Sequence, residues 1–578
     1  MNALTPTEHT FQTWDAETLF YRAWRPARPG TDAVLLFHRG HEHSGRLKDL
    51  AERLALDGVS IFAWDQRGHG RSPGARGDAP SFSTLVKDVD CFVRHVSQSE
   101  RIPVGNMAVV ATSVGSVLVS AWVHDYAPPL RALVMGTPAF RVKLYVPFAI
   151  PLLRLQQCLV RKSFIKSYVR STMLTHDADM ARDYDRDPLV SRNIAVNILL
   201  GLFDTSTRLM ADAGAIRVPA LTLSAGSDWV VSGAAQRRFH EGLSSPLKAM
   251  TVYDGFRHSV FHEKDRDVPI SRTRDFIRQA FKEPVLPADA PMSYTTREYE
   301  RLARPLSPLS PRRLGFACTK LLLKTVGRLS EGIRLGWRTG FDSGQSLDYV
   351  YENRPRGLTP VGRLIDRVYL NSVGWKGIRQ RKLNLEKALD EAICRSAPRS
   401  TPVRILDIAA GPGRYLLDVI RRTPDVPIEA VLRDRSPGAL EEGRRLARER
   451  GLTNVRFEEG DAFDPASLAS VSPGPDIAVV SGLYELFPDN AMVQRSLEGL
   501  SRLLPHDGLL VYTNQPWHPQ LEFIARVLRN RDGKPWIMRR RTQAEMDDLV
   551  LAAGFEKIGQ DIDEWGIFSV SLARKTRP

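Results

Sequence analysis

A serine, an aspartate and a histidine follow one another along the first half of the chain in the order that a nucleophilic hydrolase needs. Ser113 lies in ATSVGS, Asp228 in GSDWVV and His258 in FRHSVF. A serine hydroxyl is a poor nucleophile at neutral pH, so it needs a base that accepts its proton and a carboxylate that orients this base. Singly, the aspartate could cap a helix and the histidine could lie in a surface loop, but the ordered trio favours a catalytic triad.

The residues around the serine have the pattern of a buried strand, a tight turn and an apolar helix. Ala111 and Gly115, two positions on either side of the serine, are small enough for such a turn. An acyl-transfer intermediate also needs backbone N–H donors aimed at its oxyanion. We expect Val114 to supply one of them, and Gly40, in the loop FHRGHEHSGR, to supply the other.

A second set of candidate residues lies in VRILDIAAGPGRYLLDVI, where an apolar strand ends at Asp407. Gly411 and Gly413 would let the backbone approach a nucleotide-like ligand, which fits a dinucleotide or S-adenosylmethionine. The dehydrogenase fingerprint G-x-G-x-x-G is absent, which favours S-adenosylmethionine. The ends of the next two strands add Asp434, placed to hold ribose hydroxyls, and the pair Asp461 and Ala462, placed for adenine contacts.

Alternating apolar runs and helical patterns predict the elements that position these residues. Such alternation is typical of parallel βαβ units, so we predict an α/β protein with two doubly wound sheet domains. The apolar runs of the first sheet are 33–39, 59–65, 107–113, 131–137 and 219–226. Those of the second are 403–409, 428–434, 454–461, 476–482 and 508–514.

Composition and proline content suggest where the domains begin and end. Residues 1–283 form the predicted first domain, in which the helical stretch from about 139 to 212 is expected to be a cap over the site. Residues 284–311 are rich in proline and are predicted to be a linker. Residues 312–395 are predicted to be a helical extension, and 396–578 the second sheet domain.

The first domain resembles the monoacylglycerol lipase and serine aminopeptidase-like branch of the α/β-hydrolases. The resemblance covers residues 10–282 and rests on HRGHEHSGR, FAWDQRGHGRSPGARG, ATSVG, GSDWVV and FRH. It implies hydrolysis of a carboxylic ester of a lipid-like substrate, of monoacylglycerol or lysophospholipid type. Arg39 stands where this branch usually has glycine. Four basic residues of the cap could meet a phosphate or remain solvated: Arg154, Arg161, Lys162 and Lys166.

The second domain resembles the class I methyltransferases from about residue 375 to 578, through LDIAAGPG, Asp434 and GDAF. The resemblance implies S-adenosylmethionine as cofactor, with Asp407 holding its methionine amine; Ala409 replaces the usual glycine. Residues 341–382 are similar to the region before this motif in methyltransferases fused to hydrolases, and we expect them to cover the cofactor and shape the acceptor pocket.

The methyl acceptor is not identified by any motif. The loop SGLYELFPDN lacks the Asn-Pro-Pro-Tyr type of motif with which many enzymes methylate nucleobase amino groups. Tyr484 and Glu485 in this loop are candidate acceptor contacts, although ordinary loop packing would also explain them. Three residues after the following strand have the same status: Asn514, Gln515 and His518.

The net charge of +15 is compatible with nucleic acid, anionic lipid or a solvated basic surface. Residues 312–338 combine Lys320, Lys324 and Arg328 with leucines and a valine, which predicts a basic amphipathic helix. Such a helix could dock onto an anionic membrane or pack on a domain, and packing is the favoured interpretation. The four cysteines lack the spacing of a zinc site, and we expect no metal.

We therefore predict a bifunctional enzyme that joins a serine esterase to an S-adenosylmethionine-dependent methyltransferase. The N-terminus lacks the pattern of a secretory signal, so we expect cytoplasmic residence, with contact to the inner face of the membrane left open. Two alternatives remain. The second domain could be a non-catalytic S-adenosylmethionine-binding module that regulates the hydrolase, or it could be an RNA-directed methyltransferase, although no specific nucleic-acid partner is expected.

Overall fold

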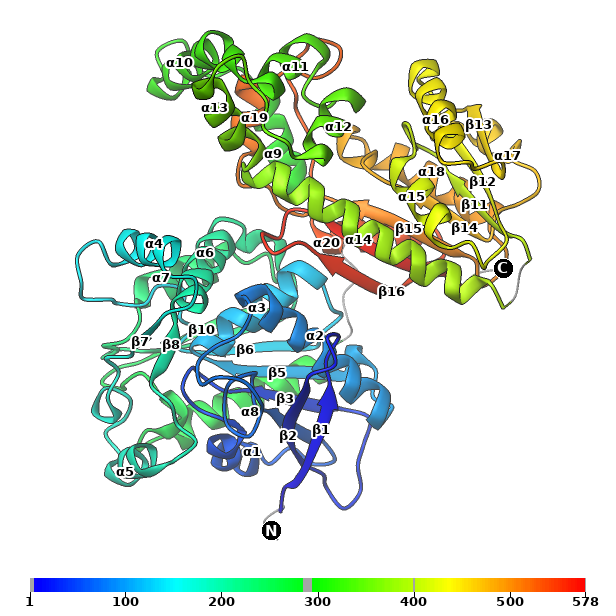
Figure 1. The fold of residues 1–578 in the computed structure, drawn as a ribbon. Helices are drawn as coiled ribbons and strands as arrows, with labels where there is room; N and C mark the ends of the chain where they lie inside the picture. Colours follow the sequence, from blue (N-terminus) through cyan, green and yellow to red (C-terminus); the bar gives the residue numbers. More distant parts are fainter. Residues whose placement is uncertain (1–4, 284–293, 399–400, 577–578) are drawn as a thin grey trace. The chain divides into compact units, whose positions relative to one another are not determined.

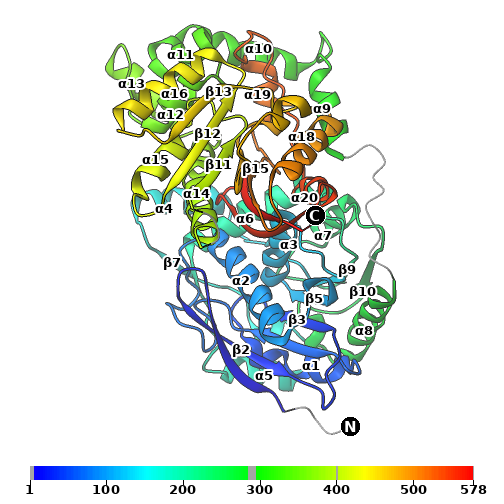
Figure 2. The same ribbon diagram turned by 90° about the vertical axis from the view of Figure 1, so that its right-hand side faces the viewer.

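The computed structural model describes residues 5–283, 294–398 and 401–576 (Figures 1 and 2). The chain divides into two compact units, Met1–Asp289 and Ala290–Pro578. Each unit contains one large sheet with helices against both of its faces, so the predicted α/β class with two sheet domains is confirmed. No helix in the described part of the chain is both long and apolar enough to cross a lipid bilayer.

The sheet of the first unit has eight strands in the order β1-β2-β4-β3-β5-β6-β9-β10. All neighbours from β4 to β10 are parallel, whereas β1 and β2 extend one edge in antiparallel fashion. The sequence pattern located the central strands but missed this antiparallel edge. The strands are β1 (Thr7–Gln12), β2 (Thr18–Trp24), β3 (Ala33–Phe37), β4 (Ser60–Trp64), β5 (Met107–Thr112), β6 (Ala132–Gly136), β9 (Ala220–Ala225) and β10 (Lys248–Tyr253).

Helices α1 (Lys48–Leu54) and α8 (Asp267–Lys282) pack their apolar side chains against one face of this sheet. Between β6 and β9 the chain leaves the sheet to form a cap. The cap contains α4 (Ala149–Leu159), β7 (Phe164–Lys166), α5 (Ala178–Arg186), β8 (Asn193–Ala195) and α6 (Val196–Ala211). Helix α6 packs against α2 (Phe82–Glu100) and α3 (Val114–Tyr126), whereas α4 has no buried side chain.

The sheet of the second unit has seven strands in the order β13-β12-β11-β14-β15-β17-β16. The first five are parallel, and β17 inserts in antiparallel fashion beside β15. The strands are β11 (Val403–Asp407), β12 (Ile428–Asp434), β13 (Val455–Glu459), β14 (Ile477–Val480), β15 (Leu509–Asn514), β16 (Phe555–Ile562) and β17 (Ser569–Lys575). The C-terminal strand pair was not recognised in the sequence.

Helices α14 (Val373–Ser396) and α15 (Arg414–Arg422) supply apolar side chains to one face of this sheet. The opposite face is covered by α18 (Asn490–Leu503) and α20 (Gln543–Ala552). The remaining helices of this sheet are α16 (Pro437–Glu449) and α17 (Pro465–Ala469). The order of the chain therefore reverses between β11 and β14, and parallel sheets bind ligands beyond the carboxyl ends of their strands at such a point.

A helical layer precedes the second sheet and shares an apolar core with the segment 521–538. Its helices are α9 (Tyr294–Ala303), α10 (Pro311–Lys324), α11 (Glu331–Thr339), α12 (Gly344–Glu352) and α13 (Pro360–Leu370), and α19 (Leu521–Val527) packs among them. The prediction of a proline-rich linker over 284–311 is wrong for Tyr294–Ala303, which form α9. The stretch YTTREYERLA contains no proline, and Leu302 is buried in this core. The first part of the predicted linker, 284–293, lies outside the described residues.

Candidate active sites

The turn from β5 into α3 places Ser113 at φ 52° and ψ −115°, a backbone conformation that residues with a side chain rarely adopt. The Ser113 N–H donates to the Gly136 carbonyl at 2.8 Å, which ties the turn to β6. A Cβ atom at Gly115 would lie 2.4 Å from the carbonyl oxygen of His38, so only glycine fits there. Ala111 is accommodated in β5 with no exposed surface. The turn therefore presents the serine side chain at the carboxyl edge of the sheet.

The three residues singled out in the first half come together at this edge. His258 Nε2 lies 2.9 Å from Ser113 Oγ, and His258 Nδ1 lies 2.8 Å from the Asp228 carboxylate. Because a carboxylate can only accept, Nδ1 donates to Asp228 and Nε2 is left to accept from the serine hydroxyl. All three side chains are buried.

The second oxygen of Asp228 is held by the protein backbone. Asp228 Oδ1 accepts from the N–H of Val230 at 2.7 Å and of Val231 at 2.9 Å. Burial by itself raises the pKa of Asp228, but the charge and hydrogen bond of His258, together with these N–H groups, hold it below its ordinary value. The carboxylate is therefore ionised at neutral pH and fixes both the tautomer and the orientation of the imidazole.

The two residues expected to bind an oxyanion are neighbours beside the serine. A Cβ atom at Gly40 would lie 3.4 Å from Cγ2 of Val114. Within residues 5–283, neither N–H is used in a turn or cap hydrogen bond. The unusual Arg39 is directed elsewhere: it pairs with Glu42 at 2.8 Å and lies over the ring of Tyr184. Its charge is therefore compensated within the loop and the cap.

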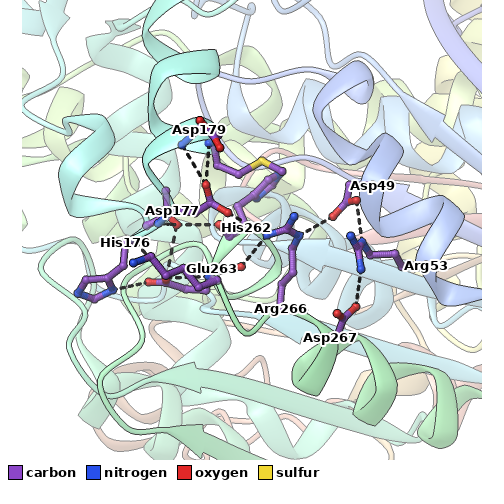
Figure 3. A network of polar contacts seen from close by, with 12 residues as sticks. Asp49, Arg53, His176, Asp177, Asp179, His262, Glu263, Arg266 and Asp267 are labelled. Atoms are coloured by element: carbon purple, nitrogen blue, oxygen red, sulfur yellow. Dashed lines mark hydrogen bonds and ion pairs between the residues drawn. The ribbon is translucent and has the colours of Figure 1, made fainter.

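A carboxylate after His258 clamps the histidine loop to the cap. Glu263 accepts from the N–H of Arg257 at 2.9 Å and from the N–H and ring Nδ1 of His176 at 3.0 and 2.9 Å (Figure 3). A second link runs beside it, because Arg266 bridges Asp177 of the cap and Asp49 of α1. These contacts fix the loop that carries His258 relative to both the cap and the sheet layer.

The second unit contains a cavity of about 1000 Å³ at the carboxyl edge of its sheet. It is lined by the turn Ala409–Arg414 after β11 and by Asp434 after β12. The expected segment 341–382 contributes many of the lining residues, among them Phe341, Trp375 and Arg381. Lining residues also come from α10, α15, α16, α19 and the loops after β14 and β15.

The glycines of the turn are required by its shape. Gly411 and Gly413 have φ angles of 55° and 70°, and a Cβ at Gly413 would lie 2.0 Å from the Leu432 side chain. A Cβ at Gly411 would meet nothing within 4 Å, which leaves room for a ligand beside the backbone. Asp434 accepts from the Gly411 N–H at 2.9 Å and from the Ser436 N–H at 2.8 Å.

Asp407 lies behind the cavity wall, and it is not among the lining residues. It is fully buried, accepts from the Ala409 N–H at 3.2 Å, and receives a short hydrogen bond from the hydroxyl of Tyr415, which does line the cavity. Burial raises the pKa of Asp407 to about 7, against the opposing effect of these hydrogen bonds. A cationic group near this position would restore its ionised form.

Three further residues of the predicted cofactor and acceptor sites do not line the cavity. Asp461 uses its carboxylate to accept from the Phe463 N–H, and the methyl group of Ala462 is buried in the apolar core. Tyr484 is buried in the same core, with its hydroxyl bound to Ser496 at 3.0 Å. Its neighbour Glu485 does line the cavity, where it pairs with Arg381 at 3.3 Å. Loop packing therefore accounts for Tyr484, and not for Glu485.

Gln515 and His518 also line the cavity. The sequence offered them only as candidate acceptor contacts that ordinary loop packing would explain equally well. Both follow β15, and the place of a residue after a parallel strand is the only signal that could have promoted them. Arg381, on α14, carried no such signal, because a long helix gives no indication of which side chains face a cavity.

Comparisons with known proteins agree with this architecture. Residues 29–265 match the family described as "Serine aminopeptidase, S33", and residues 273–575 match the family described as "Putative methyltransferase". The chain is thus a fusion of an α/β-hydrolase with a member of this methyltransferase family. The second match spans the helical layer as well as the second sheet, so the two form one family unit.

A relative that shares both halves is the uncharacterized protein YnbC of Escherichia coli strain K12, with 47% identity over 99% of each chain. The present chain belongs to the same family. A monoacylglycerol lipase of Mycolicibacterium smegmatis is 25% identical over 48% of this chain and 99% of its own length. The crystal structure of the Paleococcus ferrophilus monoacylglycerol lipase covers the same share of this chain, with 22% identity and a TM-score of 0.41.

The clamp on the histidine loop should make stability depend on pH through Glu263. Burial raises the pKa of Glu263, but the N–H groups of Arg257 and His176 outweigh it and hold the pKa below its ordinary value. The stabilisation is therefore present above the unfolded-state pKa of about 4.3 and is lost as the pH falls through the folded-state pKa. We expect Glu263→Gln to lower the free energy of unfolding by about 1–3 kcal/mol at neutral pH, and by less below about pH 4.

Urea unfolding of the full chain at a series of pH values measures this difference. The matched control is Asp267→Asn, since Asp267 belongs to the same network but its side chain is 73% exposed in its pair with Arg53 (Figure 3). Equal destabilisation by the two variants at neutral pH, or a pH-independent effect of Glu263→Gln, would contradict the assigned role of the clamp.

Proposed function

We propose that the first unit is a serine hydrolase that cleaves a carboxylic ester of a lipid-like substrate, of monoacylglycerol or lysophospholipid type. The observation that carries the proposal is the chain of contacts from Ser113 Oγ to His258 Nε2 at 2.9 Å and from His258 Nδ1 to Asp228 at 2.8 Å. Similarity to monoacylglycerol lipases supports the choice of ester.

In the proposed reaction, Ser113 Oγ attacks the ester carbonyl while His258 Nε2 accepts its proton. Asp228 stabilises the imidazolium that forms, and the N–H groups of Gly40 and Val114 bind the oxyanion. His258 then returns the proton to the leaving alcohol, which leaves an acyl group on Ser113. A water molecule activated by the same histidine releases the acid and restores the serine.

The cap supports an apolar substrate. Helix α4 exposes Phe148, Leu152, Leu155 and Leu159 at its start and along its length. Two of the basic cap residues that could have met a phosphate are engaged in ion pairs instead, Arg154 with Asp204 and Lys162 with Asp78. We therefore assign acyl-chain contact to the cap rather than phosphate recognition.

Replacement of the nucleophile tests the first half. Ser113→Ala should reduce turnover of a monoacylglycerol by at least about 10³-fold, because the acyl-enzyme cannot form. Release of the fatty acid is the measurement, and thermal unfolding should be unchanged. Ser99→Ala, an exposed serine on α2, is the control and should keep full turnover. Retained turnover in Ser113→Ala would rule out the assigned nucleophile.

We infer that the second unit binds S-adenosylmethionine, whose sulfonium supplies an activated methyl group. The open side of Gly411 and the fixed carboxylate of Asp434 support a nucleoside at the turn. We propose that Asp434 holds the ribose hydroxyls, and that Asp407 and Tyr415 together receive the cofactor's amino group, which would favour the ionised form of Asp407. The turn and these acids orient the cofactor, so this end of the cavity needs no covalent catalysis.

Cofactor binding can be measured independently of the acceptor. By isothermal titration calorimetry, Asp434→Asn should weaken S-adenosylmethionine binding by about tenfold or more, because a charge-assisted hydrogen bond is lost. Asp425→Asn, an exposed acid after α15, should have no effect. Equal affinity in both variants would contradict the ribose assignment. Cofactor that binds, is never consumed and changes the esterase rate would instead favour a regulatory module.

We also propose that the second unit contacts an anionic bilayer through α10, the turn 326–329 and α13, three elements that pack together. Two side chains of the predicted basic helix, Phe316 and Leu323, pack against the apolar core of the helical layer. Other large apolar side chains of these elements are exposed, at spacings that give one stripe on each helix. They are Leu314, Leu321, Leu322 and Val326, and then Val361, Leu364 and Val368. Exposed cations accompany them at Arg328, Arg363 and Arg367.

A charged residue within the stripe should abolish this contact. Leu321→Glu, at a side chain that is 63% exposed, should lower co-sedimentation with phosphatidylglycerol vesicles by about tenfold, because apolar burial is lost and like charges repel. The control is Leu551→Glu on α20, at a side chain that is 60% exposed, and it should bind as the parent does. Binding should weaken in phosphatidylcholine vesicles and at high salt. Equal loss in both variants, or no binding by the parent, would refute the bilayer contact.

A further inference from the structure

The cavity of the second unit measures about 1000 Å³. This volume is at the upper end of the roughly 300–1,000 Å³ that is usual for ligand pockets. Aromatic and aliphatic lining residues gather in one apolar cluster, made up of Phe341, Tyr369, Trp375, Trp536 and Met538. This apolar cluster, which we call the acceptor chamber, has the chemistry of a site for a hydrocarbon group.

Two buried polar groups that line this cavity, the Gln515 amide and the Trp536 indole N–H, have no hydrogen-bond partner among the described residues. Gln515 is 1% exposed, lines the cavity, and makes no hydrogen bond through either Nε2 or Oε1. An unpaired buried amide is costly, so buried amides are nearly always hydrogen-bonded in folded proteins. The exception is explained if a bound molecule supplies the partner. The Gln515 amide therefore marks the place where a ligand's polar group binds.

A second donor comes from the same loop. His518 Nδ1 accepts from the Gln520 N–H at 3.0 Å, so the proton of the neutral ring is on Nε2. Burial lowers the pKa of His518 to about 4, which keeps the ring neutral at physiological pH. With one nitrogen accepting and the other protonated, His518 can donate to a ligand but cannot serve as a base.

The carboxylates that line the cavity are all engaged with partners. Asp342 pairs with Arg531, Asp348 and Glu442 with Arg414, and Glu485 with Arg381, while Asp434 holds two N–H groups. An ammonium would have to compete with these partners for a carboxylate, and an alcohol would have to lose its proton to a base as it is methylated. An ionised carboxylic acid needs neither.

We propose that the methyl acceptor is a lipophilic carboxylate, with its hydrocarbon chain in the acceptor chamber and its head group at Gln515 and His518. The proposal rests on the proposed S-adenosylmethionine-dependent function. A carboxylate oxygen attacks the methyl carbon, the carbon–sulfur bond breaks, and its electron pair stays on sulfur. The products are a methyl ester and S-adenosylhomocysteine, and no proton moves.

The position of the chamber suits such a molecule. Val368 lines the cavity and is also 67% exposed, on the apolar stripe of α13. The chamber thus reaches the surface that carries the exposed leucines and valines, where an amphiphile would be concentrated. Ester hydrolysis releases a carboxylic acid, so the reaction proposed for the first unit generates the acceptor class proposed for the second.

The test uses the purified full-length protein, methyl-labelled S-adenosylmethionine and four probes. These are dodecanoate, dodecan-1-ol, dodecylamine and acetate, which separate the head group from the chain. We expect label in methyl dodecanoate, and little in the alcohol, the amine or acetate. Cofactor that binds in calorimetry while dodecanoate stays unlabelled would overturn the acceptor assignment alone. Failure of the cofactor to bind would overturn the proposed function and this inference with it.

A variant of Gln515 separates a binding role from a structural one. Gln515→Leu should raise the KM for dodecanoate by about tenfold or more, with S-adenosylmethionine affinity unchanged. Because the amide is unpaired, its removal should leave the melting temperature unchanged or raise it. The control Gln494→Leu, on α18 and hydrogen-bonded to Glu498, should keep the parent KM. An unchanged KM in Gln515→Leu, or a lowered melting temperature with the KM unaffected, would refute the head-group site.

Discussion

Both sites depend on a tight turn that leads from a buried parallel strand directly into a helix. At this turn Ser113 has φ 52° in the first unit, and Gly413 has φ 70° in the second. A backbone strained at a residue with a side chain costs about 1–3 kcal/mol and persists only where its surroundings enforce it. Around Ser113 they do so through the Gly136 carbonyl and the close approach of Gly115 to His38. The side chain that these contacts hold at the sheet edge is the one proposed to react.

Residues that could be placed from the sequence are those whose position follows from a strand end. Ser113, Asp228 and His258 are far apart in the chain, but the carboxyl edge of a parallel sheet gathers them. What failed was the direction of individual side chains. Tyr484 and Glu485 are consecutive in a short 3-10 turn, so one enters the core while the other faces the cavity. Sequence periodicity gives no such direction within a loop.

The charge composition likewise did not indicate which basic side chains are buried and which are exposed to solvent. Three consecutive arginines, Arg539, Arg540 and Arg541, are almost fully buried rather than solvated. Arg540 pairs with Glu298 of α9, and Arg541 donates to backbone carbonyls of the loop 484–487. Burial of a guanidinium is tolerated where carbonyl and carboxylate oxygens satisfy its donors. Arg540, through Glu298, and Arg539, through Thr296, hold α9 against the rest of the second unit, although flanking prolines favoured a linker in this stretch.

For the proposed hydrolase, the Glu263 clamp limits how the cap could move to admit a bulky substrate. Since Glu263 joins the His258 loop to the cap residue His176, a cap that swung away as one rigid lid would pull the histidine out of register with Ser113. Helix α4, by contrast, has no buried side chain to hold it. For the proposed hydrolase, we therefore expect any rearrangement of the cap to be confined to the part near α4, while the part near His176 stays attached to the histidine loop. A rearrangement confined to that part would leave the contacts among Ser113, His258 and Asp228 in place, so these residues would need no reassembly between turnovers.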